Sequence, residues 1–193
     1  MAKFTGNAGF SLIEVLVTIV ILLIGLLGLA GLQGRALTAQ MESYQRAQAL
    51  VLLQDMADRI ATNRKNAASY ITTAPLGTGG TCPTGTTLAD IDLCAWNAAL
   101  QGAAETQSGV GDVGAMIGAR GCVYQDAVPV SGVATTYSVV VAWQGMDNTA
   151  APDIKYPYSA GQCGYNQYTN QSGTPTETLH RAITLPIAVA DLQ

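Results

Sequence analysis

The chain has 193 residues, a length that suits one membrane anchor and one domain of ordinary size. Its charge is uneven, because residues 1–65 carry six basic and four acidic side chains, whereas residues 66–193 carry three basic and nine acidic ones, a net charge of −6. Nucleic-acid binding depends on Lys and Arg at the phosphates, so this acidic region disfavours broad contact with DNA or RNA, and we expect no nucleic-acid partner.

A long apolar segment lies close to the N-terminus. No residue from Val15 to Gly34 is charged. As a helix this run would be about 30 Å long, which matches the hydrocarbon core of a bilayer. We therefore predict a transmembrane span over residues 12–34. Glu14 stands at the head of the run, and a carboxylate beside a span is costly enough to indicate a function.

The residues at the start of this segment form a motif. Gly9, Phe10 and Glu14, followed by the apolar run Val15–Leu32, resemble the type III signal of type IV pilins and type II secretion pseudopilins. The resemblance implies that prepilin peptidase removes the nine-residue leader Met1–Gly9 and that Phe10 is then N-methylated. It also implies that the Glu14 carboxylate pairs with the methylated amine of the same or an adjacent subunit during assembly. Such a pair lowers the cost of burying either charge.

The segment after the motif resembles one subgroup of this family. Residues 26–33, Leu-Leu-Gly-Leu-Ala-Gly-Leu-Gln, resemble minor pilins of the PilV kind. This similarity implies a minor pilin that takes part in pilus assembly, in priming or in a tip complex, with other minor pilins and the major pilin as partners. It implies a single-pass protein in inner-membrane lipid with its head in the periplasm, and later a place in the pilus at the cell surface.

Three alternatives remain open. The chain could be a pseudopilin of type II secretion, which uses the same anchor, or a DNA-uptake or adhesion pilin whose head binds a ligand. Leu37-Thr38-Ala39 could also be a weak signal-peptidase site, which would release a soluble protein. We expect no enzymatic activity and no cofactor, because no catalytic constellation is evident.

Four glycines recur at an interval of three within and just beyond the apolar run: Gly25, Gly28, Gly31 and Gly34. Small residues let helices approach closely in a membrane, which is one interpretation. Each glycine also weakens an isolated helix by about 1 kcal/mol relative to alanine, so the segment could instead loosen inside a fibre. The sequence does not decide between packing and loosening.

The helix is expected to continue beyond the membrane. Apolar residues at steps of three and four predict an amphipathic stripe, first at Leu37, Met41 and Tyr44 and then at Leu53, Met56 and Ile60. We therefore expect three regions: a leader over 1–9, a long N-terminal helix over 10–65 and a periplasmic globular head over 66–193.

The first half of the head is rich in turn residues. Residues 71–86 contain many Thr, Gly and Pro residues and are predicted to form a loop, as are residues 101–121. Between them, Thr87 and Asp90 resemble a capping box, which predicts a helix from Leu88 to Leu100.

The second half of the head is predicted to form strands. The candidates are Cys122–Val128, Thr135–Gln144, where alternation is strongest, and Leu179–Val189. Pro186 lacks an N–H for a strand ladder, so the last strand should lie at a sheet edge, or Pro186 should sit where its missing N–H faces outward. The expected fold is α+β, the type IV pilin-like fold, with the long N-terminal helix packed on a small antiparallel sheet.

Four cysteines, Cys82, Cys94, Cys122 and Cys163, follow the apolar run. An even count in an exported domain favours two disulfides. We favour Cys82–Cys94 and Cys122–Cys163, since joining neighbours needs the least rearrangement, although three pairings are possible. A zinc site is disfavoured because no C-x-x-C occurs and the lone His180 has no ligand at a suitable spacing, so we expect no metal.

Asp90 with Asp92, His180 and four tyrosines are the other polar candidates for a site. Asp90 and Asp92 could bind a cation, but acids also stabilise a helix start. His180 is expected to be a strand residue that faces solvent. Four tyrosines could form a recognition surface or simply fill gaps over the sheet: Tyr156, Tyr158, Tyr165 and Tyr168.

Overall fold

The computed structural model describes residues 9–103, 106–107, 111–112, 116–126, 133–153 and 160–190. The chain divides into two compact units, Met1–Met41 and Glu42–Gln193, and each is treated by itself below.

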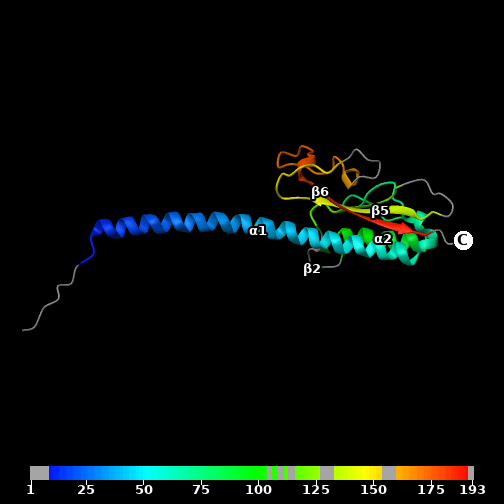
Figure 1. The fold of residues 1–193 in the computed structure, drawn as a ribbon, viewed down its shortest axis with the longest axis horizontal. Coiled ribbons are helices and arrows are strands. Elements are labelled where there is room, and N and C mark those ends of the chain that lie inside the picture. The colour runs from blue at the N-terminus through cyan, green and yellow to red at the C-terminus, as the bar shows by residue number, and fades with distance from the viewer. Residues whose placement is uncertain are drawn as a thin grey trace, which may run out of the picture. The chain divides into compact units, whose positions relative to one another are not determined.

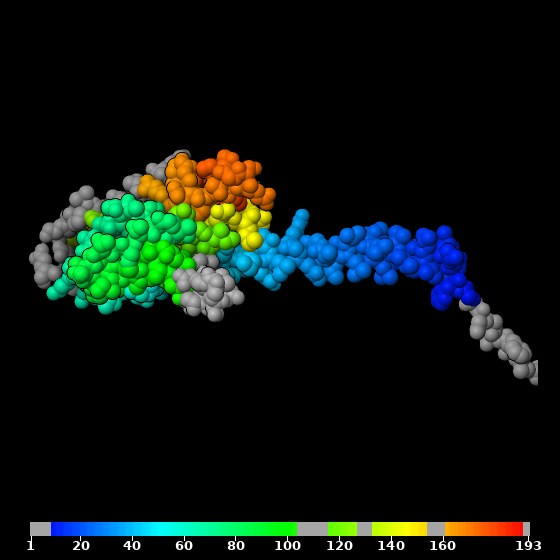
Figure 2. Space-filling view, turned by 180° about the vertical axis from the view of Figure 1, so that it is seen from behind, coloured from blue at the N-terminus to red at the C-terminus, as the bar shows by residue number. Residues whose placement is uncertain are grey.

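The helix α1 (Leu12–Thr62) begins in the first unit and ends in the second. It is shorter than the predicted helix over 10–65 at both ends. After Thr62 the chain continues as the 3-10 helix η1 (Arg64–Tyr70). Within the first unit the apolar side chains of α1 are exposed, as the blue part of Figure 2 shows. Within the described residues, α1 is the one helix long and apolar enough to cross a membrane.

In the second unit α1 contributes one face to the core. Its buried residues are Gln45, Ala49, Leu53, Met56, Ala57 and Ile60. The predicted stripe at Leu53, Met56 and Ile60 is therefore confirmed. The earlier part of that stripe is exposed rather than buried, with Leu37, Met41 and Tyr44 at 63%, 47% and 49% exposure. Tyr44 lies nine residues before Leu53, which is two and a half turns, so it points to the opposite side of the helix.

The sheet has four antiparallel strands in the order β1-β4-β5-β6, of which Figure 1 labels β5 and β6. These strands are β1 (Leu76–Gly77), β4 (Arg120–Gln125), β5 (Thr135–Gln144) and β6 (His180–Val189). Three were predicted, and β6 lies at an edge, as Pro186 indicated. β1 lies in the predicted loop over 71–86. A separate pair of short strands, β2 (Thr106–Gln107) and β3 (Gly111–Asp112), lies in the predicted loop over 101–121.

The central strand β5 is buried on both faces. Val139 and Val141 join the main core with α1 and α2 (Leu88–Leu100). Val140 and Ala142 belong to a second cluster on the opposite face of the sheet, and the rest of this cluster is Cys122, Cys163 and Tyr168. The alternation in the sequence predicted the strand, and the segment that contains Cys163 buries its second face.

The helix α2 begins with the predicted capping box. The Thr87 hydroxyl accepts from the Asp90 N–H, and the Asp90 carboxylate accepts from the Thr87 N–H. Trp96 is fully buried, and its indole N–H donates to the Leu52 carbonyl of α1 at 3.0 Å. A side chain at Gly121 on β4 would collide with the Trp96 ring, so glycine allows α2 to pack closely on the sheet. This α+β arrangement of a long helix on a small antiparallel sheet is the predicted fold.

Candidate functional site

The motif residues lie at the start of α1. Gly9 and Phe10 precede the helix, and the Phe10 side chain is 85% exposed. Glu14 lies in the first turn and is also exposed. The Glu14 and Val15 N–H groups donate to the Ser11 carbonyl at 3.0 and 3.2 Å. A carboxylate is favourable at this position because unpaired N–H groups give a helix start a partial positive charge.

From Val15 to Leu32 the helix offers only apolar and small side chains. Its most apolar window has a mean hydropathy of 2.9, and none of that window is buried. A Cβ built at any of Gly25, Gly28, Gly31 and Gly34 would meet no described atom within 4 Å. The glycine positions are thus open within this chain. Both helix packing and loosening remain compatible with them.

The second unit contains a polar contact at Glu42, which the sequence did not predict. The Glu42 Oε1 atom accepts from the Met146 and Asp147 N–H groups at 3.0 and 3.3 Å and from Arg181 Nη2 at 3.1 Å. Burial alone would raise the pKa of Glu42, but these donors outweigh it and lower the pKa below its ordinary value. The contact fastens α1 to β6 and to the segment after β5.

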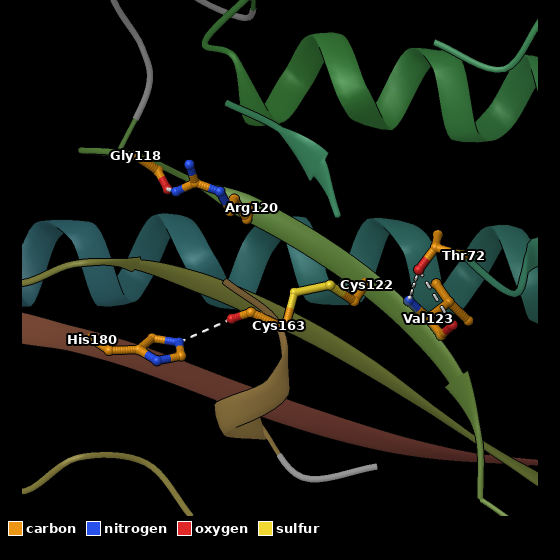
Figure 3. The surroundings of a disulfide bond; sticks show 7 residues. All are labelled: Thr72, Gly118, Arg120, Cys122, Val123, Cys163 and His180. Atoms are coloured by element: carbon orange, nitrogen blue, oxygen red, sulfur yellow. Dashed lines mark hydrogen bonds between the residues drawn. A yellow bond between two sulfur atoms is a disulfide. The ribbon is translucent and has the colours of Figure 1, made fainter. Parts of the chain in front are cut away.

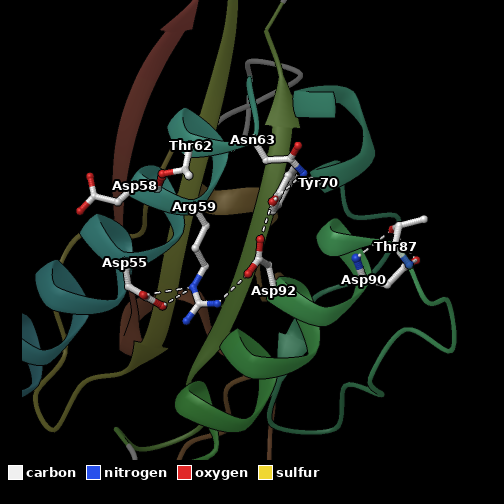
Figure 4. A network of polar contacts seen from close by, with 9 residues as sticks. All are labelled: Asp55, Asp58, Arg59, Thr62, Asn63, Tyr70, Thr87, Asp90 and Asp92. Carbon is white, nitrogen blue, oxygen red and sulfur yellow. Dashed lines mark hydrogen bonds and ion pairs between the residues drawn. The ribbon is translucent and has the colours of Figure 1, made fainter. Parts of the chain in front are cut away.

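A second polar network joins α1, η1 and α2 (Figure 4). Arg59 donates to Asp55 on its own helix at 3.1 Å and to Asp92 on α2 at 2.9 Å. The buried Tyr70 hydroxyl donates to the other oxygen of Asp92 and accepts from Asn63. Burial, and then the Asp92 carboxylate, raise the pKa of Tyr70 to about 12.

Both acids of the candidate cation site are engaged in other contacts. Asp90 caps α2, and Asp92 belongs to the network with Arg59 and Tyr70. Across the residues that the structure describes, no group of three or more His, Cys, Asp or Glu side chains could hold a metal ion.

Both cysteine pairs favoured from the sequence are disulfides in the structure. Cys82 is joined to Cys94 on α2, twelve positions later. Cys122 on β4 is joined to Cys163, forty-one positions later (Figure 3). The second bridge holds the segment around Cys163 against the face of the sheet that the helices leave open.

The prediction for His180 was wrong. Its side chain is buried rather than solvent-facing, with a residue exposure of 1%. Nε2 lies 2.9 Å from the Cys163 carbonyl, and Nδ1 lies 2.6 Å from the Glu177 carboxylate, which also accepts from the Asn166 N–H. His180 therefore holds the disulfide-linked segment to the start of β6.

The tyrosines do not share one surface. Tyr168 is fully buried beside His180, and burial raises its pKa to about 12. Tyr165 is 45% exposed. Tyr156 and Tyr158 lie outside the described residues. For Tyr168 the gap-filling interpretation is therefore correct.

Comparison with known proteins adds two family matches. Residues 5–30 match the model of the prokaryotic N-terminal methylation motif, and residues 31–101 match the Tt1218-like model, described as type IV pilin Tt1218. No curated protein matches the chain, and no solved structure matches it. The two matched segments adjoin and cover the motif, α1 and α2. The methylation motif, the apolar helix and the long helix packed on an antiparallel sheet together support a type IV pilin-like family for this chain.

Proposed function

We propose that this chain is a minor pilin of the PilV kind. Prepilin peptidase cleaves between Gly9 and Phe10 and methylates Phe10, which becomes the first residue of the mature chain. The observation that carries this proposal is the register of Phe10 and Glu14 at the start of an exposed, uncharged helix, inside the segment that matches the methylation motif.

Glu14 gives assembly its selectivity in this proposal. The methylated amine of Phe10 remains cationic, and Glu14 lies one turn further along the chain. An unpaired charge in an apolar environment is expensive, so each amine and each carboxylate gain by finding a partner. A subunit that enters the fibre in the correct axial position supplies that partner, and one that enters out of register leaves two charges unpaired.

The exposed helix supports the membrane stage of the proposal. The span over 12–34 holds the protein in inner-membrane lipid, and its apolar side chains then exchange lipid for the helices of other minor pilins and the major pilin. The head over 66–193 lies in the periplasm, where an oxidising environment supports its two disulfides.

Mass spectrometry of the mature chain tests the processing step. We expect an N-terminus at Phe10 that carries one N-methyl group. An N-terminus at Gln40, after Leu37-Thr38-Ala39, would refute the pilin assignment and indicate a released soluble protein.

Fibre composition tests the role of Glu14. Glu14→Gln should be processed normally, yet its amount in sheared fibres should fall at least tenfold relative to the wild type. Asp58→Asn removes an exposed acid of α1 in the second unit and is the matched control, with unchanged incorporation expected. Wild-type incorporation of Glu14→Gln would refute the pairing argument, and recovery of the chain with secretion machinery instead of pili would indicate a pseudopilin.

The amount of wild-type chain in the same fibres tests minor status. We expect far fewer copies of this chain than of the major pilin, and loss of fibres when it is deleted. A fibre composed mainly of this chain would contradict the minor-pilin assignment.

A further inference from the structure

A polar pocket of about 810 Å³ lies in the second unit. One wall is the segment after η1, from which five threonines line the pocket: Thr72, Thr73, Thr78, Thr81 and Thr84. Another wall comes from the segment after η2 (Ala160–Gln162), which contributes Tyr165 and Gln167. The pocket is therefore rich in hydroxyl and amide groups and is within the size range of small-molecule sites.

Arg120 brings a buried positive charge to this pocket. Its residue exposure is only 9%, and it lines the cavity from the start of β4, beside Gly118 (Figure 3). Nη1 donates to the Gly118 carbonyl at 3.1 Å, and Nη2 donates to Gln167 at 3.4 Å. The guanidinium also lies 5.2 Å from the centre of the Tyr168 ring. A guanidinium has five N–H donors, so several remain available to a ligand.

No described carboxylate neutralises Arg120. Asp90 is the acid that lines the pocket, and its Oδ2 atom is engaged by the Thr87 backbone and hydroxyl. A buried charge without a counter-ion is unfavourable, and an arginine fork matches a carboxylate with two parallel hydrogen bonds. The pocket therefore has the charge and geometry for an anionic ligand larger than a simple ion.

The pocket does not suit a peptide strand. Peptides commonly bind by extending an open sheet edge. The adjacent edge strand β1 is already occupied, because the Gly77 N–H donates to Asn97 and the Gly77 carbonyl accepts from Gln101. The pocket instead has hydroxyl and amide side chains around one cation, and the aromatic side chain of Tyr165 is exposed. These groups fit a cyclic ligand that carries hydroxyls and one carboxylate.

We propose that this pocket binds a carboxylate-bearing sugar. Arg120 binds the carboxylate, and the Tyr165 ring packs against the sugar face. The Gln167 side chain and the lining threonines other than Thr72 bind the sugar hydroxyls, because the Thr72 hydroxyl is already bonded to the Val123 backbone. This function goes beyond fibre assembly and does not require it, so either proposal can fail without the other.

Calorimetric titration of the full chain, in a detergent without a sugar head group and at constant ionic strength, tests this proposal. The probes are glucuronate, glucose as the uncharged ring and acetate as the carboxylate alone. We expect wild-type protein to bind glucuronate at least tenfold more tightly than either of the others. Equal binding of glucuronate and glucose would overturn the role of the cation, and equal binding of glucuronate and acetate would overturn the sugar.

Two variants and a control locate the site. Arg120→Gln should reduce glucuronate binding at least tenfold, to the level of glucose. Arg64→Gln, which removes an exposed arginine of η1 outside the pocket, should leave binding unchanged. Tyr165→Ala should weaken both sugars several-fold and not acetate. Unchanged glucuronate binding by either pocket variant would overturn the assignment. If Arg120→Gln fails to fold, Tyr165→Ala and the three wild-type titrations test the proposal instead.

Discussion

Replacement of Asp92 offers a direct test of how the head is held together. Asp92 accepts from Arg59 on α1 and from the buried Tyr70 hydroxyl of η1. Asp92→Ala leaves the Tyr70 hydroxyl without an acceptor, at a cost of about 1–3 kcal/mol for a buried group. The Arg59 contact adds about 1 kcal/mol or less, since the two side chains are 31% and 14% exposed. We expect a total loss of about 1–4 kcal/mol.

Urea unfolding of the full chain in detergent, followed by tryptophan fluorescence, measures this loss. Trp96 and Trp143 are the two tryptophans of the chain, and both are buried in the second unit, so the signal reports the head. Asp92→Asn keeps an oxygen for Tyr70 and should lose about half as much as Asp92→Ala. Asp58→Asn, an exposed acid of α1, is the control and should lose less than about 0.5 kcal/mol.

A double-mutant cycle with Tyr70→Phe separates the two contacts of Asp92. Without the hydroxyl, Asp92→Ala should cost about 1–2 kcal/mol less than in the wild type. An Asp92→Ala variant within about 0.5 kcal/mol of the wild type would refute the reasoning, because a buried donor would then have lost its acceptor at no cost.

Three further outcomes follow from contacts in the second unit. Replacing both Cys122 and Cys163 by serine should lower the free energy of unfolding by about 4 kcal/mol, the loop-closure value for a separation of 41 residues, as measured by urea midpoints without reductant. Burial raises the pKa of Tyr70 and Tyr168 from 10.0 to about 12, so their contribution to stability is complete below pH 10 and is lost as the pH rises toward 12. Urea midpoints between pH 9 and 11.5 should show this decline, and phenylalanine at both positions should flatten it. The pKa of Glu42 is lowered from 4.5, so Glu42→Gln should be less stable than the wild type by about 1 kcal/mol at pH 7, and the gap should close as the pH falls below 4.5.

Features that depend on local sequence were predicted well. The Thr87–Asp90 capping box and its helix depend on residues three positions apart. The strand β5 follows from alternation over ten residues, and Pro186 correctly indicated an edge strand. The motif with Phe10 and Glu14 is also local, and it lies in the segment that matches the methylation-motif model, but the roles of these two residues stay predictions.

Features that depend on distant contacts were not predictable in the same way. His180 is buried because the disulfide of Cys163 brings a segment seventeen positions earlier over its ring. Glu42 meets Arg181 across 139 positions, and no periodicity links the two. The strand β1 has two residues, too few for any repeating pattern, and forms because β4 provides its hydrogen-bonding partner.

The pocket lay beyond sequence reasoning for a similar reason. Arg120 was one basic residue in an acidic head, with nothing nearby in the sequence to indicate burial or a missing counter-ion. The threonine-rich segment was predicted as a loop, which is largely correct, but its role as the wall of a cavity depends on the segment around Gln167.

The two edge strands of the sheet have a consequence for the proposed fibre, in which many heads would lie close together. An open strand edge on each head would invite strands of neighbouring heads to pair and aggregate. Here one edge, β1, is only two residues long, and Asn97 and Gln101 already bond its Gly77. The other edge, β6, carries Pro186, a residue that edge strands tolerate where its nitrogen faces away from the neighbouring strand. In the fibre proposed above, these two edges would disfavour strand pairing between neighbouring heads and leave their contacts to side chains.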